Sequence, residues 1–156
     1  MLLMSREVKF RIWDKTSNRM LYQDDFERVE LDTKNKMVSL VRSETIESSY
    51  VLDYEDGIEA EIMQYTGFKD TKNKEIYEGD ILHVTKVSMC GVDKYNVAEY
   101  NTDVRWEDGA FVIKGDADVD CYDTWLASYN NPDSPQIEIE VIGNIYENPE
   151  LLEGKQ

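Results

Sequence analysis

Short runs of alternating apolar and polar residues, each followed by turn-forming residues, constrain this chain most strongly. The run VKFRIW, residues 8–13, alternates Val8, Phe10 and Ile12 with basic side chains, and this period of two predicts a strand with one buried face. Turn residues DKTSNR follow, and the strand–turn–strand pattern recurs around DTKNK at 32–36 and again at 70–74. Aspartate and asparagine suit such connections. Each pattern predicts a β-hairpin, and we interpret the two identical pentapeptides as surface turns without inferring a structural repeat.

The second half of the chain continues the strand pattern. DILHVTKV, starting at residue 80, predicts a strand in which His83 is a core or cross-strand residue, and SMCGVDKYN at 88–96 predicts a loop. The Asp108-Gly109 pair between apolar runs is a strong hairpin signal, because glycine accepts a positive φ without steric cost. Residues 136–142 then supply a closing strand. About seven to nine short strands at this spacing favour a small barrel or sandwich.

The domain organisation follows from length and from one ambiguous region. A chain of 156 residues suits one domain or two small ones. Residues 44–63 are acidic and mixed in character, so they predict a short helix or an extended segment with a boundary near residue 60. We therefore expect an N-terminal β-rich segment, 1–60, which is either a separate subdomain or an arm on a neighbouring subunit, and a barrel domain, 61–156. One compact unit remains the alternative.

The strongest compositional feature is a net charge of −16. Residues 99–156 contain 14 acidic residues against 3 basic ones, which gives −11 in the last third of the chain. This charge opposes direct binding to nucleic acid, whose phosphates bind basic surfaces, and it opposes docking to an anionic membrane. We find no apolar run of membrane-spanning length and no signal-peptide pattern, so we expect a cytoplasmic protein without membrane contact. Its acidic surface either aids solubility or imitates DNA phosphates.

Candidate chemistry is sparse. The segment DADVDCYD resembles the start of a calcium loop, which makes Asp116, Asp118, Asp120 and Asp123 weak metal candidates, but Cys121 occupies the glycine position and Ala127 the position of the bidentate glutamate. On a strand, the first three aspartates would simply share a solvent face. His83 is the only histidine, neither Cys90 nor Cys121 has an activating context, and no phosphate-binding glycine motif occurs. We therefore predict no catalytic residues, no cofactor and no enzyme activity.

The stretch MQYTGFKDTKNKEIYEGDIL, residues 63–82, predicts a hairpin followed by the entry of a strand into a barrel. Gly67 and Gly79 permit unusual backbone angles, and Asp80 can bond the loop backbone before Ile81 enters the barrel. A Gly-Asp-apolar run of this kind is typical of strand starts in SH3-like barrels. The alternative makes Tyr65 and Tyr77 aromatic contacts for a ligand, and the structural interpretation is favoured.

Three blocks of the sequence resemble the YopX family of bacteriophages and prophages. They are KFRIWD at 9–14, the stretch at 63–82 and VIGNIYENPELL at 141–152, and they span nearly the whole chain. Phe68 replaces a more usual leucine, and DTKNK lacks the family's frequent Asn-Gly turn, which are mild departures. The resemblance implies a mainly β fold, that is a β-rich α+β fold, with an N-terminal β-hairpin region, a small SH3-like β-barrel in the C-terminal part and homo-oligomerisation. It implies no established activity. The hallmark residues that it brings, as fold determinants or as a subunit interface, are Trp13, Tyr65, Gly67, Tyr77, Gly79, Asp80, Gly143, Asn144, Tyr146 and Pro149.

Two functional hypotheses follow. The first is a non-catalytic phage accessory protein that acts through protein–protein contacts, with itself and with an unidentified phage or host protein. The second is an acidic decoy that imitates DNA and occupies a DNA-binding host protein, for which the −11 charge of the last third is the motive. A divalent-metal-dependent nuclease is a distant third.

Overall fold

The chain forms two compact units built almost entirely from antiparallel strands. A computed structural model describes residues 7–42, 49–91, 94–115, 124–129 and 137–153. The two units comprise residues 1–64 and 65–156, and β6 (Ala60–Lys69) runs from the first into the second. Whether the first unit is a separate subdomain or an arm on a neighbouring subunit stays a prediction.

The first unit contains two small sheets. Strands β1 (Phe10–Asp14) and β2 (Arg19–Tyr22) form the predicted hairpin, and β1 also pairs with the first half of β6. The second sheet has the order β3 (Arg28–Asp32), β4 (Met37–Val41), β5 (Tyr50–Asp53), so the first DTKNK connects β3 and β4 as predicted. Short 3-10 turns, η1 (Gln23–Asp25) and η3 (Glu55–Gly57), make the connections.

The core of the first unit is formed by side chains from both of its sheets. Ile12 of β1, Leu21 of β2 and Ala60 of β6 lie in one buried cluster with Val38 and Leu40 of β4. Val38 and Leu40 occupy alternate positions in β4, and they point to the same face because successive side chains of a strand point to opposite faces. The alternation that predicted strands in the sequence therefore also builds this core.

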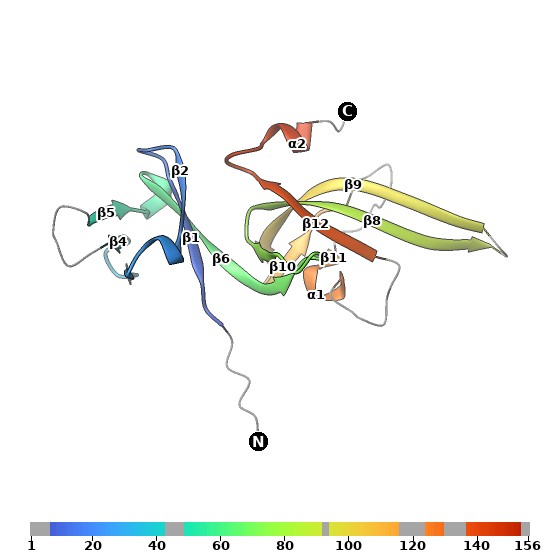
Figure 1. The fold of residues 1–156 in the computed structure, drawn as a ribbon, viewed down its shortest axis with the longest axis horizontal. Helices are drawn as coiled ribbons and strands as arrows, with labels where there is room; N and C mark the ends of the chain where they lie inside the picture. Colours follow the sequence, from blue (N-terminus) through green and yellow to red (C-terminus); the bar gives the residue numbers. More distant parts are fainter. Residues whose placement is uncertain (1–6, 43–48, 92–93, 116–123, 130–136, 154–156) are drawn as a thin grey trace, which may run out of the picture. The chain divides into compact units, whose positions relative to one another are not determined.

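The second unit is a five-stranded antiparallel sheet that curls into a half-barrel (Figure 1). Its order is β11 (Thr124–Trp125), β10 (Ala110–Ile113), β9 (Lys94–Glu107), β8 (Asp80–Gly91), β12 (Ile137–Asn144). The second half of β6 pairs with β7 (Glu75–Tyr77), and the second DTKNK connects these two strands as predicted. Two one-turn helices, α1 (Leu126–Tyr129) and α2 (Glu150–Glu153), complete the unit.

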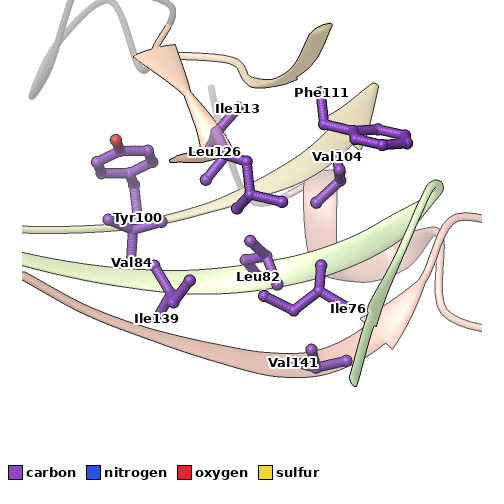
Figure 2. Close-up of a cluster of buried hydrophobic side chains, with 10 residues drawn as sticks. All are labelled: Ile76, Leu82, Val84, Tyr100, Val104, Phe111, Ile113, Leu126, Ile139 and Val141. Atoms are coloured by element: carbon purple, nitrogen blue, oxygen red, sulfur yellow. The ribbon is translucent and has the colours of Figure 1, made fainter. Parts of the chain in front are cut away.

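A single cluster of buried side chains fills the concave side of the half-barrel. Leu82 and Val84 of β8 face Ile139 and Val141 of the neighbouring β12, and Leu126 of α1 covers them (Figure 2). Full burial of each such aliphatic side chain stabilises the fold by roughly 1.5–3 kcal/mol. The remaining members are Ile76, Tyr100, Val104, Phe111 and Ile113.

The hairpin of β8 and β9 corrects one prediction. Residues 88–96, predicted as a loop, are strand up to Gly91 and again from Lys94. The pairing reaches from Ile81↔Asp103 to Gly91↔Lys94, and Figure 1 shows the two strands side by side as a long ribbon that extends past β12. The polar, glycine-containing composition was typical of a loop, but cross-strand pairing between two long strands holds this segment extended.

Other expectations are confirmed. The chain is mainly β, with a barrel-like C-terminal part in the form of the half-barrel. Asp108 and Gly109, with φ of 51° and 80°, turn β9 into β10 as the hairpin signal predicted. The His83 Nδ1 lies 2.8 Å from Asn101 Oδ1 on the adjacent strand, which makes it a cross-strand histidine. Within the described ranges, no helix is long and apolar enough to cross a membrane.

Candidate functional site

The hallmark residues of the second unit lie at two connected places, the β6–β7 pairing and the ends of β8 and β12. Tyr65 and Tyr77 are cross-strand partners, both buried, with ring centroids 5.5 Å apart. Trp13 is buried on β1 of the first unit. The two tyrosine rings therefore pack on each other, and the role of Tyr65 and Tyr77 as fold determinants stays a prediction.

The turn Glu78-Gly79 between β7 and β8 is fixed from three sides. The buried carboxylate of Asp80 accepts a hydrogen bond from the Tyr77 amide at 2.7 Å. Gly79 donates its N–H to the Val104 carbonyl of β9 and accepts from the Ile145 amide, both at 2.9 Å. The turn thus connects β9 to the segment that follows β12 through the two hydrogen bonds of Gly79.

The end of β12 forms a second closed network. The side chain of Asn144, which is buried, accepts from the amides of Tyr146 and Glu147 at 3.1 and 2.9 Å. Gly143 has no room for a side chain, because a Cβ there would lie 2.5 Å from Asn148 Oδ1. The exposed Pro149 precedes α2. These contacts fit a role in the fold, and a subunit interface at Tyr146 and Pro149 stays a prediction.

Gly67 shares a left-handed backbone with Gly79, whose φ is 81°, but its own surroundings leave space for a side chain. It is exposed with φ of 85°, and nothing lies within 4 Å of the position of a Cβ. It lies at the irregularity where the β6–β7 register shifts between Tyr65 and Lys69. Thr66 supports the same irregularity by donating its hydroxyl to the Ile76 carbonyl at 2.7 Å. A left-handed backbone at this bulge requires glycine.

The outer face of the half-barrel carries a polar hollow. Glu140 of β12, His83 of β8 and Asn101 of β9 stand side by side in the strand register. Lys72 of the turn after β6 reaches over this face to Glu140, with Nζ and Oε1 at 2.5 Å, and that hydrogen bond raises the pKa of Lys72. The His83 Nε2 lies 3.9 Å from Glu99 Oε1. The arrangement places one imidazole among carboxylates and amides.

A metal site is not formed by the described residues, in which no three histidine, cysteine, aspartate or glutamate side chains gather. The candidates Asp116, Asp118, Asp120 and Asp123 lie outside the described residues. The calcium-loop interpretation therefore stays a prediction.

An apolar groove in the first unit is the candidate functional site. It lies between β1 and β3, and we call it the β1–β3 groove; it is a hollow of about 130 Å³. Val8 and Leu31 are 55% and 40% exposed at its surface. The other lining residues are Phe10, Ile12, Val29, Val38 and Ile62, with Gln23 as the polar member. A concave apolar site with exposed aliphatic side chains is the usual form of a binding site.

Sequence reasoning missed this groove. The segment DDFERVEL, residues 24–31, has apolar spacing near that of a helix, and only its second half becomes β3. The available signal was the alternation of Val29 and Leu31 with charged residues, which marks one apolar face of a strand. That Leu31 stays exposed on this face could not be read from the alternation.

The fold defines a small mainly-β protein with a half-barrel and, in its first unit, an apolar groove. The comparisons with known proteins give its family. The family model of the YopX protein matches residues 9–153, so the chain belongs to the YopX family. Protein EF1440 from Enterococcus faecalis is 27% identical, with a TM-score of 0.59 over 95% of this chain and 99% of that chain. Protein YopX from Bacillus subtilis is 26% identical, with a TM-score of 0.60 over 92% of this chain and 97% of that chain. None of the functionally curated proteins matches.

Proposed function

We propose that this chain is a non-catalytic accessory protein of a phage or prophage, which acts in the bacterial cytoplasm by binding another protein. The observation that carries the proposal is the β1–β3 groove. Val8 and Leu31 keep apolar surface in water there, and a partner that covers it gains the free energy of removing that surface from water. The relatives from two bacteria support a bacterial setting.

Self-association is the second part of the proposal. Val97 and Trp106 of β9 are 57% and 51% exposed, so the second unit also carries apolar surface that another copy can cover. Sedimentation velocity over a range of protein concentrations tests this part. A chain that remains monomeric at the highest concentration contradicts self-association, and it leaves the proposed partner binding at the groove unaffected.

The test of partner binding is an affinity capture from bacterial lysate, eluted by stepped salt and analysed by mass spectrometry. Three forms of the chain are immobilised: the natural sequence, Leu31→Ser in the groove and Val51→Ser as the control. Val51 is 51% exposed on β5 and does not line the groove. A protein captured by the natural and control forms and lost with Leu31→Ser supports the proposal, and equal capture by all three forms contradicts it.

The acidic decoy is the second candidate. Glu99, Glu138 and Glu140 lie on the outer face of the half-barrel, opposite the buried cluster, and they add to the −11 charge of the last third. A partner that normally binds DNA should elute at moderate salt, because its contacts replace phosphate contacts. Reversal of Glu138 and Glu140, or of Asp116, Asp118 and Asp120, to lysine should abolish its capture, and unchanged capture contradicts this candidate.

A further inference from the structure

The size of the β1–β3 groove limits what it can bind. Its volume is about 130 Å³, close to the roughly 150 Å³ of an engineered apolar cavity that binds benzene. Seven of its eight lining side chains are apolar. The groove therefore fits one bulky apolar side chain, such as leucine or phenylalanine, and not a folded surface.

The charge around the groove limits what can carry that side chain. Gln23 at one end of the groove is followed by three exposed acidic residues, Asp24, Asp25 and Glu27, and residues 23–27 contain no basic residue. The basic residues next to the lining residues in sequence, Lys9 and Arg28, form ion pairs with Glu7 at 2.9 Å and with Glu30 at 2.6 Å. The surroundings of the hollow are thus acidic, and they favour a basic ligand.

The same charge argues against a second copy of the chain as the occupant. A symmetric dimer brings the same patch of both subunits together, so two acidic margins would face each other across the groove. An extended segment is the better fit, because β3 is the terminal strand of its sheet in the described part of the chain, and a peptide can lie along such a strand.

We propose that the β1–β3 groove binds an extended segment of a partner protein that carries one bulky apolar side chain flanked by lysine or arginine. The inference rests on the proposed function, since it assumes a protein partner, and it names the chemistry of the bound segment. The apolar side chain enters the groove beside Leu31, and the flanking cations meet the acidic margin.

The test uses three fluorescently labelled nine-residue peptides and the full chain, with binding measured by anisotropy. The first peptide has a central leucine between lysines, the second replaces the lysines by glutamates, and the third replaces the leucine by serine. We expect the first to bind at least tenfold more tightly than either of the others, and to weaken as salt rises. Leu31→Ser should weaken it about tenfold, because most of the transfer free energy of one leucine is lost.

Val8→Ser and Val51→Ser are a matched pair, because both valines are about half exposed and only Val8 lines the groove. We expect a loss of affinity of about threefold for Val8→Ser and none for Val51→Ser, with unchanged circular dichroism for both. Equal losses for the two variants overturn the inference. Equal binding of the lysine and glutamate peptides, or of the leucine and serine peptides, also overturns it.

Other occupants give distinct results. If sedimentation shows a dimer that dissociates with Leu31→Ser, the occupant of the groove is a second copy of the chain. If the peptide binds only after deletion of residues 1–6, the occupant is the chain's own first residues. Either result overturns the inference. If no peptide binds while lysate capture still depends on Leu31, the proposed function stands and only the partner chemistry is wrong. If capture is also independent of Leu31, both proposals fail.

Discussion

The two copies of DTKNK have the same five residues and different structures. In the first copy, the exposed Asp32 accepts hydrogen bonds from the amides of Lys34 and Asn35, both at 3.0 Å, and from the Asn35 side chain at 2.8 Å. Asp32 pairs with Met37, and the left-handed residue is the fifth of the motif, Lys36, with φ of 58°. The three hydrogen bonds that this carboxylate accepts from Lys34 and Asn35 stay within the turn.

In the second copy, the turn binds another strand. Asp70 is buried, and its Oδ1 accepts from the amides of Lys72 and Lys74 while its Oδ2 accepts from the Val141 amide of β12 at 2.9 Å. Thr71 exchanges two more hydrogen bonds with the backbone of Ile139. The left-handed residue is now the fourth of the motif, Asn73, with φ of 67°.

The difference teaches that turn chemistry is local while turn conformation is not. Aspartate caps nearby amides in both copies, as its side chain does in turns generally. The strand that lies alongside decides the rest, because β12 presents backbone N–H and C=O groups that require partners when buried. The second copy therefore closes the edge of β12, and the first only reverses the chain.

The largest expected effect on the free energy of unfolding comes from replacing the aspartate of each DTKNK turn. Asp70→Ala should lower the free energy of unfolding by about 2–4 kcal/mol, because it leaves the buried Val141 amide unsatisfied and removes two turn bonds. Asp32→Ala should cost clearly less, since water replaces its partners. Urea unfolding curves measure both, and equal losses would show that the docking on β12 contributes no stability.

The threonines separate the docking from the turn itself. Thr71→Val removes the hydroxyl that accepts the Ile139 amide at 3.0 Å, and it should cost about 1 kcal/mol. Thr33→Val at the same place in the first copy should leave the unfolding midpoint unchanged. A loss at Thr33 as large as at Thr71 would mean that the threonine acts through turn propensity.

Glycine at the fifth position should act with opposite sign in the two copies. Lys36→Gly should stabilise by about 0.5–1 kcal/mol, because glycine adopts the left-handed backbone without strain. Lys74 does not have that backbone, so Lys74→Gly should destabilise by about 0.5 kcal/mol through the entropy of the unfolded chain. Thermal melts of both variants would reveal the signs, and a shared sign would refute the assigned conformations.

The smallest expected effect is the contribution of Asp32 to the pH dependence of stability. The hydrogen bonds from Asn35, its amide first, hold the pKa of Asp32 below its ordinary 3.8. A folded-state pKa below the unfolded one stabilises the fold above that ordinary value, and the contribution is lost as the pH falls through the folded pKa. Carbon NMR of the Asp32 carboxyl should give a midpoint below 3.8, and Asn35→Ala should move it upward. An unchanged midpoint in that variant would exclude the Asn35 side chain as a cause, because alanine keeps the backbone amide.

Much of the fold was predictable, and the candidate site was not. The hairpins at 14–19, at both DTKNK turns and at Asp108-Gly109 followed from alternation and turn residues. The tip of the β8–β9 hairpin was missed, because residues 88–96 pair from Ser88↔Asn96 to Gly91↔Lys94 although their polar, glycine-containing composition is typical of a loop. The β1–β3 groove was missed because exposure of Val8 and Leu31 depends on where neighbouring elements end.

The sequence by itself determined the local events of this protein: which residues alternate, where the chain turns, and which aspartates cap those turns. It also carried the family, through three blocks, the later two of which meet where β8 begins and β12 ends. Only the tertiary structure decided that one DTKNK holds β12 and the other does not, and that one apolar strand face stays open as a groove. The physical reason is that turns and strand periods depend on adjacent residues, whereas burial and hydrogen-bond closure depend on which distant strand arrives beside them.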